Sequence, residues 1–249
     1  MMPANQFDRT IRLLGRPALE RLHQARVAVF GLGAVGSYAA EALARSGVGH
    51  LRLVDFDTVE PSNINRQLFA LHSTLGQKKA DVAKNRVLDI NPACRVEICE
   101  TFVNADSLDA LLSADLDVVV DAIDGLNSKV NLLVAARQMN LFVVSSMGAG
   151  GRMDVSLIRT GDIADTHMCP LARMVRQRLH RRRIYTGIRC VYSLEKPITS
   201  PFPDIVDIPE GSYKDSGKGT GHGRKRTTIG TVPWIPGIFG LTLAAEAVH

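Results

Sequence analysis

VFGLGAVG, residues 29–36, is a short apolar run that leads straight into the pattern G-x-G-x-x-G. The apolar residues predict a buried strand, and the alanine-rich stretch that follows predicts a helix. Glycines at Gly31, Gly33 and Gly36 allow a tight turn and bring backbone N–H groups close to a phosphate, beside the positive end of the helix dipole. The stretch therefore predicts a nucleotide site, and the alternative is a turn whose glycines serve helix–sheet packing only.

Strands and helices alternate around this unit over the first two-thirds of the chain. The predicted strands are 26–31, 50–57, 95–103, 116–124 and 141–148, and the predicted helices are 35–49, 76–92 and 127–140. Repeated strand–helix–strand units predict an α/β fold, a Rossmann-like, doubly wound and mostly parallel sheet with helices on both faces. Ligands on such sheets bind beyond the carboxyl ends of the strands, where the polar segments of this chain fall.

The pattern weakens from about residue 160. Residues 199–230 are rich in Gly, Pro, Ser and Thr, which predicts a long loop. We therefore expect a nucleotide-binding domain at 1–160 and a smaller, loop-rich C-terminal region at 161–249. Prolines and Glu246 interrupt the apolar stretch 231–249, which favours a buried helix or a docking surface over stable membrane insertion. The chain ends without a helix-capping signal, which leaves a longer native C-terminus open.

Composition narrows the class of protein. The chain has 249 residues, 45% of them hydrophobic and 22% charged, which excludes a wholly disordered chain. Its formal charge of +5 favours polyanionic partners. The polar N-terminus carries no export signal, so a cytoplasmic protein with free thiols is expected. The four cysteines, Cys94, Cys99, Cys169 and Cys190, form no C-x-x-C pair, so no structural zinc site is expected.

The segment after the second strand, DFDTVEPSNINRQ at 55–67, indicates which nucleotide binds. Asp55 lies 19 residues after Gly36, where an acid commonly bonds ribose hydroxyls. A triphosphate carries about four charges and needs extra cations and usually Mg²⁺, whereas the glycine turn largely serves a dinucleotide pyrophosphate. A lone basic residue is usually solvated surface, but here several polar and basic residues accompany the glycine turn. This combination favours a triphosphate. The residues in question are Asp57, Ser62, Asn63, Asn65, Arg66 and either Lys78 or Lys79.

Two aspartates follow the fourth predicted strand in VDAID. Residues three apart on an extended strand point to opposite faces, so at most one of Asp121 and Asp124 faces the cleft unless the strand has already ended. Asp124 is the better placed as a Mg²⁺ ligand. Asp121 is expected to bond loop backbone.

Taken together and in order, GLGAVGS, LVDFDTVEPSNINRQ, LGQKKA, INP and DAID resemble the adenylating superfamily that includes ubiquitin-activating enzymes and the bacterial proteins ThiF and MoeB. The resemblance covers roughly residues 5–160. It implies an adenylation domain that binds ATP and Mg²⁺ and transfers AMP to a carboxylate.

The resemblance also implies roles for single residues. Asp55 would bond the ribose, Asn63, Arg66 and Lys79 would contact the phosphates, and Asp124 would hold Mg²⁺.

An arginine near the N-terminus carries a further implication. Arg9, in FDRTIRLLG, matches a residue that reaches the γ-phosphate in the partner subunit's site, which implies a homodimer. One departure is Gly125, where many relatives carry Asn, so the contact made by that asparagine is not carried over to this chain.

The sequence beyond the core points to one branch. SSMGAGGRMD, then IRTGDIADT, a basic helix, CVYSLEKP and a Gly-rich tail resemble the tRNA threonylcarbamoyladenosine dehydratase branch. There the threonyl carboxylate beside the anticodon would attack the α-phosphate of ATP, and the neighbouring carbamoyl group would close a ring and expel AMP. Such chemistry needs a charge clamp for the transition state. It needs no cysteine nucleophile.

Basic runs at 172–189 and 218–226 are consistent with tRNA phosphates as partners. The alternative is a solvated helix face with a loose tail. Only 5% of the residues are aromatic, so phosphate and shape contacts are expected to carry the affinity, and Tyr185 and Tyr192 are better placed as anchors than as stackers. The candidate tRNA contacts are Arg173, Arg176, Arg181, Arg182, Arg183, Arg224, Lys225 and Arg226.

Other functions stay open at this point. Adenylation of a small sulfur-carrier protein is the main alternative, which the missing C-x-x-C pairs disfavour. A nicotinamide oxidoreductase would need no triphosphate clamp, and a non-catalytic tRNA-binding dimer would need no ATP. Cys169 is expected at a helix start, where a thiolate is stabilised, and the sequence leaves both a nucleophilic role for it and a sulfur-transfer partner open. Cys190, His72 and His167 are expected to be structural.

Overall fold

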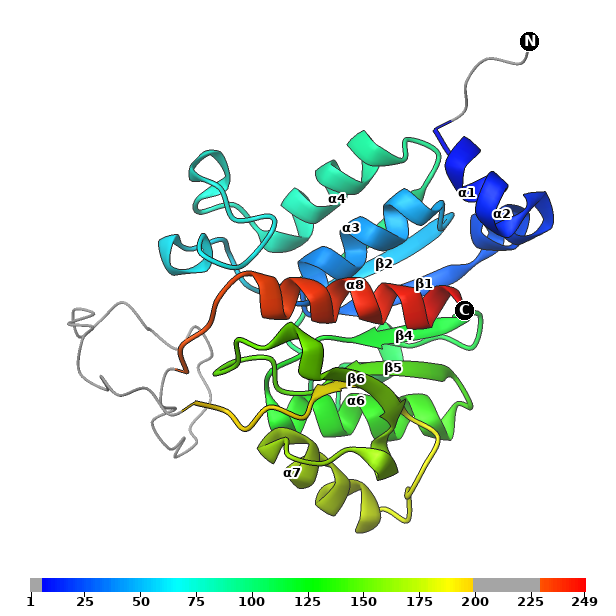
Figure 1. The fold of residues 1–249 in the computed structure, drawn as a ribbon. Coiled ribbons are helices and arrows are strands. Elements are labelled where there is room, and N and C mark those ends of the chain that lie inside the picture. The colour runs from blue at the N-terminus through cyan, green and yellow to red at the C-terminus, as the bar shows by residue number, and fades with distance from the viewer. Residues whose placement is uncertain (1–5, 199–228) are drawn as a thin grey trace.

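Seven strands form one sheet in the order β3-β2-β1-β4-β5-β7-β6 in the computed structural model, which describes residues 6–198 and 229–249 (Figure 1). The strands are β1 Arg26–Phe30, β2 His50–Val54, β3 Arg95–Cys99, β4 Val118–Asp121, β5 Phe142–Ser146, β6 Ile158–Asp162 and β7 Arg189–Ser193. The helices are α1 Asp8–Leu14, α2 Arg16–Gln24, α3 Gly36–Ser46, α4 Lys79–Ile90, α5 Leu108–Leu111, α6 Leu126–Gln138, α7 Pro170–His180 and α8 Trp234–Val248.

The sheet is doubly wound, as predicted. From β1 the chain adds β2 and β3 on one side, then returns to add β4 and β5 on the other, all in parallel. β4 is buried along its whole length, which explains its run of valines. The winding reverses between β1 and β4, and their carboxyl ends are where such a fold binds its ligand.

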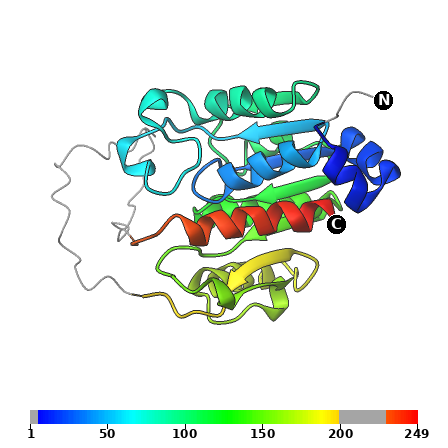
Figure 2. The ribbon, with the colours of Figure 1, turned by 45° about the horizontal axis from the view of Figure 1, so that its top comes forward.

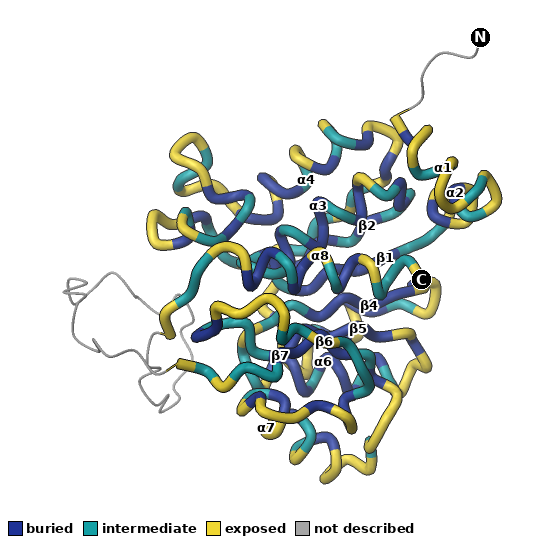
Figure 3. The backbone as a smooth tube through the Cα atoms, in the orientation of Figure 1, coloured by how far each residue is buried: buried dark blue, intermediate teal, exposed yellow. Residues whose placement is uncertain are grey.

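Helices cover both faces of the sheet (Figures 1 and 2). One buried cluster joins the sheet to α3, α4 and α8, and a second joins the other face to α5, α6 and α7. The tube in Figure 3 shows the central strands β1, β4 and β5 largely buried and the exposed residues gathered in loops and outer helix faces.

The C-terminal helix α8 packs against α3, the helix that begins at the glycine turn. A Cβ added to Gly240 would lie 2.3 Å from the carbonyl oxygen of Val35, so only glycine permits this close approach. The expectation of a buried C-terminal helix is confirmed. Across residues 6–198 and 229–249, no helix combines the length and apolar character that crossing a membrane requires.

The predicted strands and helices up to residue 148 are confirmed, each somewhat shorter than expected. Beyond residue 157 the sheet gains two strands that the sequence pattern did not indicate. β7 lies parallel to β5, and β6 lies antiparallel to β7. The sheet is therefore continuous past residue 160, and the division at that residue stays a prediction.

The basic helix expected after IRTGDIADT is confirmed as α7, but it covers only part of the basic run 172–189. α7 ends at His180, and the backbone then turns through Arg183 at φ +60° and Gly187 at φ +87°, both left-handed. Most of the loop predicted at 199–230, with Arg224, Lys225 and Arg226, lies outside the described residues.

Candidate nucleotide site

The glycine turn lies between the carboxyl end of β1 and the first residue of α3. Gly31 has φ +86°, and a Cβ there would lie 2.9 Å from the carbonyl oxygen of Ala122, in the loop after β4. A Cβ on Gly36 would lie 1.7 Å from the Gly31 carbonyl oxygen. The geometry of the turn therefore requires both glycines.

Gly33 differs from its neighbours in the turn. Its φ is not left-handed, and the nearest atom to a Cβ built there is Nε2 of Gln67, at an unstrained 3.8 Å. Packing thus gives no reason for a glycine at this position. Its missing side chain leaves the backbone at the start of α3 open, which suits a phosphate that must approach the N–H groups closely.

Asp55 fastens the end of β2 to the glycine turn. One carboxylate oxygen accepts the backbone N–H of Leu32 at 2.6 Å, and the other accepts that of Asp57 at 2.9 Å. Burial raises the pKa of Asp55, which the positive charge of Lys79 and the two backbone hydrogen bonds partly oppose. Each oxygen keeps a second lone pair, so the carboxylate can still accept a ribose hydroxyl.

Lys79, rather than Lys78, reaches this edge of the sheet. It is the first residue of α4 and is buried, with its Nζ 2.9 Å from Oδ2 of Asp57. Lys78 instead lies 3.6 Å from Glu100. An ammonium group has three donors, and Asp57 uses one of those on Lys79. Asp57 therefore holds Lys79 at the site with donors left for a phosphate.

The segment 61–70 lies beside the start of α3. The hydroxyl of Ser37 accepts the backbone N–H of Leu68 at 3.1 Å. Asn63 is buried and its side-chain oxygen accepts the N–H of Glu60 at 3.3 Å. These bonds fix the segment next to the glycine turn.

Arg66 is anchored by the same segment through one of its terminal nitrogens. Nη1 donates to the carbonyl of Ser62 at 2.7 Å and to the side-chain oxygen of Asn65 at 2.9 Å. A guanidinium has five donors. Those on Nε and Nη2 have no partner among the described residues, so they are available for an anion.

Asp121 and Asp124 take different places, as predicted. Asp121 is fully buried, and its Oδ1 accepts the N–H of Ile123 at 3.1 Å. Its Oδ2 lies 2.5 Å from Nζ of Lys129, another fully buried group, and 2.6 Å from the hydroxyl of Ser145. This network holds the loop 122–125.

Asp124 lies on that loop and is exposed. No other described residue forms a hydrogen bond or an ion pair with it. Because Gly31 touches Ala122 on the same loop, Asp124 lies at the β1–β4 edge near the glycine turn. A free carboxylate there is the kind of group that binds Mg²⁺ through one ligand plus phosphate oxygens and waters.

The donor set suits Mg²⁺ delivered with a nucleotide better than an all-protein metal site. Within 6–198 and 229–249 no three His, Cys, Asp or Glu side chains gather to hold a metal. Since Mg²⁺ keeps several waters and needs only one or two carboxylates beside substrate phosphates, Asp124 alone meets that requirement.

Arg9 is exposed on α1, which lies at the far end of α3. Phe7 borders Gly47, which caps the C-terminal end of α3, whereas the glycine turn begins that helix. Eleven residues of α3 span about 16 Å. Figures 1 and 2 both place α1 at the end of the sheet opposite the segment 55–78. Arg9 therefore does not reach the site of its own chain.

The basic residues on α7 and in the turn that follows it differ in exposure. Arg173, Arg181, Arg182 and Arg183 are exposed, but Arg176 donates to the carbonyl and hydroxyl oxygens of Thr166. Arg176 is thus largely occupied within the fold.

The remaining candidates lie away from the nucleotide edge or inside the protein. Cys169 precedes α7 as predicted and is buried, and Cys190 is buried in β7, where desolvation raises its thiol pKa. All four cysteines are free. Tyr192 is buried and packs on His167, while Tyr185 is exposed and lies against His180.

Sequence reasoning missed several buried polar residues, among them Ser37, Lys129 and Arg152. Ser37 directly follows the glycine pattern. Lys129 lies four residues before Leu133 on the apolar face of its helix, where a lysine needs a buried partner. Arg152 donates to carbonyl oxygens of Gly148, Gly150 and Glu195, while its Nη2 has no partner in the described residues. No sequence pattern distinguishes Arg152 from a surface arginine.

The chain is similar to known proteins over nearly its whole length. The ThiF family model matches residues 7–249. The chain is 38% identical to tRNA threonylcarbamoyladenosine dehydratase of Bacillus subtilis over 98% of this chain and 93% of that protein. It is 39% identical to the protein of that name in Escherichia coli, over 98% and 92%. The crystal structure of the Escherichia coli dehydratase in complex with ATP aligns with a TM-score of 0.83 and 33% identity, over 98% of this chain and 92% of that one. The sheet, the glycine turn and these matches together show that the chain belongs to the ThiF family.

Proposed function

We propose that this protein is an ATP-dependent tRNA threonylcarbamoyladenosine dehydratase. The observation that carries the proposal is the set of groups at the β1–β4 edge: an open glycine turn, Lys79 held by Asp57, and the exposed carboxylate of Asp124. These groups suit a triphosphate with a metal ion. The similarity to dehydratases of that name extends over nearly the whole chain, which favours their substrate over a carrier protein.

The nucleotide would lie across the carboxyl ends of the strands, with its ribose at the end of β2 and its phosphates at the glycine turn after β1. Asp55, at the end of β2, would accept the ribose hydroxyls. The N–H groups at the start of α3 would bind phosphate oxygens, with Asn63, Arg66 and Lys79 around them. In this arrangement the α-phosphate faces the β1–β4 crevice, where a substrate carboxylate can enter.

Reaction would begin when a threonyl carboxylate oxygen bonds to the α-phosphorus and pyrophosphate leaves. The carbamoyl group of the same nucleoside would then attack the acyl carbon, lose its proton and expel AMP with the former carboxylate oxygen. Arg66 and Lys79 would stabilise the charge that develops on the phosphate oxygens. The attacking groups all belong to the substrate, so Cys169 has no part in the reaction.

Asp124 would hold Mg²⁺ with the phosphates of the bound nucleotide. When bound there, the ion would supply positive charge against the phosphate oxygens.

We also propose that the enzyme is a homodimer in the cytoplasm. Arg9 is too far from its own site to act there, so it would serve the partner subunit's γ-phosphate. The two parts of the chain would then have different roles. Residues 1–160 would bind ATP, and residues 161–249 would bind tRNA through the exposed side chains of Arg181, Arg182 and Arg183.

The test uses the full chain with ATP, Mg²⁺ and tRNA carrying threonylcarbamoyladenosine. The expected products are AMP and a nucleoside lighter by one water, measured by mass spectrometry after digestion. The matched control is the same tRNA without the threonylcarbamoyl group, which should yield no AMP. An unchanged nucleoside, with ATP–pyrophosphate exchange only when a small carrier protein is added, would favour carrier adenylation instead.

A further inference from the structure

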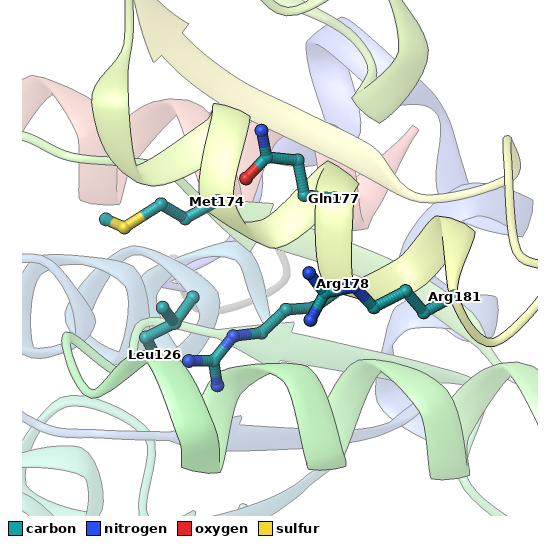
Figure 4. A pocket seen from close by; sticks show the side chains of 5 residues that line it. All are labelled: Leu126, Met174, Gln177, Arg178 and Arg181. Carbon is teal, nitrogen blue, oxygen red and sulfur yellow. The ribbon is translucent and has the colours of Figure 1, made fainter.

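A pocket between α6 and α7 opens next to the loop that carries Asp124. It measures about 240 Å³ and is lined by Leu126, Met174, Gln177, Arg178 and Arg181 (Figure 4). Leu126 is the first residue of α6 and lies two residues after Asp124. The pocket therefore lies beside the metal side of the candidate site, on the side of the sheet covered by α6 and α7.

The charge of the pocket selects an anion. No Asp or Glu occurs between Asp165 and Glu195, and neither Arg178 nor Arg181 forms an ion pair within the described residues. Arg178 donates to the side-chain oxygen of Asn127, a neutral group. Two guanidinium groups thus border the pocket without a counter-charge.

The rest of the lining suits a nucleobase. Leu126 and Met174 are partly exposed apolar side chains, and Gln177 adds an amide with both donors and an acceptor. Unstacked RNA bases are commonly bound by stacking on planar groups, including guanidinium, and by hydrogen bonds at their edges. The volume lies below the range of about 300–1,000 Å³ typical of small-molecule sites, so a single nucleotide fits better than a whole cofactor.

We propose that this pocket binds one nucleotide of the substrate RNA, adjacent to the modified adenosine. Arg178 and Arg181 bind its phosphates, and its base packs on Met174 and Leu126 within reach of Gln177. The inference rests on the proposed function, since the RNA in question is its substrate. It explains why a basic helix lies next to the Asp124 loop: the pocket directs the RNA strand toward the activated phosphate.

The test measures binding of a fluorescent anticodon stem-loop RNA by anisotropy over a range of salt concentrations. Arg178→Gln with Arg181→Gln should weaken binding about tenfold and lower the slope of log affinity against log salt by about 1.4, which corresponds to two single-strand phosphates. Met174→Ser should weaken binding without changing the slope. Arg178 also bonds Asn127. The single variant Arg181→Gln loses no hydrogen bond or ion pair to the described residues, and it should show half the slope change.

Arg16→Gln with Arg21→Gln is the matched control, since it removes two exposed charges from α2 at the opposite end of α3. Wild-type RNA affinity in the Arg178/Arg181 variant, or an equal loss in the control, would overturn the proposal. Unchanged RNA binding with lost binding of a poly-glutamate peptide would also overturn it, by assigning the pocket to a protein. Conversion of the modified nucleoside is followed separately: a wild-type enzyme that binds RNA but yields no AMP would refute the function and leave the pocket supported.

Discussion

Lys129 and Asp121 form an ion pair in which both side chains are completely buried, with Nζ 2.5 Å from Oδ2. The lysine also donates to the carbonyl of Ser146 at 2.9 Å, so the pair joins α6 to the ends of β4 and β5. The adjacent loop carries Asp124. The pair therefore stabilises the loop that carries Asp124, the candidate metal ligand, without contacting Asp124 itself.

Lys129→Met should destabilise the protein by about 3–5 kcal/mol, because it leaves the Asp121 carboxylate buried and unpaired. Chemical denaturation of the two proteins checks this. Adding Asp121→Asn to Lys129→Met should restore at least half of the loss, since no buried charge remains. A single variant within about 1 kcal/mol of the wild type would contradict the assignment of a buried ion pair.

Gly33→Ala should leave the free energy of unfolding unchanged to within about 0.5 kcal/mol, because its Cβ meets only Gln67 at 3.8 Å. The same variant should bind ATP at least about tenfold more weakly, a loss of about 1.4 kcal/mol, if phosphate oxygens occupy the space over the turn. Gly36→Ala is the contrasting variant and should lose both stability and binding. Normal ATP affinity in Gly33→Ala would show that the nucleotide does not contact this glycine.

Binding of adenosine should weaken as the pH is lowered below neutrality. Burial raises the pKa of Asp55 above its ordinary value of 3.8, so the carboxyl takes up a proton at a higher pH than an exposed aspartate does. Protonation removes an acceptor for the ribose, and binding should accordingly release protons. Calorimetry in buffers of different ionisation enthalpy measures this release. Asp55→Asn should bind with little pH dependence, and an equal dependence in that variant would exclude Asp55 as its source.

Asp124→Asn should raise the Mg²⁺ concentration needed for half-maximal AMP formation by about tenfold or more, since a neutral amide is a weaker ligand for a hard cation than a carboxylate. Stability should be unchanged, because Asp124 is exposed and makes no bond within the described residues. Titration of activity with Mg²⁺ provides the comparison. An unaltered Mg²⁺ requirement would remove Asp124 from the metal site.

The sequence predicted the glycine turn, the parallel core and the separate places of Asp121 and Asp124 because each depends on local pattern. The geometry of the turn requires Gly31 and Gly36. Burial of β4 on both faces of the sheet requires its valines. Strand β7 was missed because it pairs with β5, more than 40 residues earlier in the chain, and β6 was missed because it joins the sheet through β7. Such contacts leave no periodic signal.

Side-chain partners were the other limit of prediction. The sequence places Lys129 on an apolar helix face but does not identify Asp121 as its partner. No sequence pattern indicates that Arg152 is buried or that Arg176 bonds Thr166. Likewise, only the packing of α7 on α6 brings Arg178 and Arg181 beside Leu126 to form a pocket. These partners and this pocket are formed by residues that are far apart in the chain. They can therefore be identified only from the folded structure.

The central claim is that a substrate carboxylate is activated by bonding to the α-phosphorus of ATP. The most direct measurement uses tRNA whose threonyl carboxylate is labelled with oxygen-18, followed by mass spectrometry of the products. The account predicts that each AMP carries one labelled oxygen while the cyclised nucleoside keeps the other. Unlabelled AMP, or label found in inorganic phosphate, would contradict adenylation of the carboxylate.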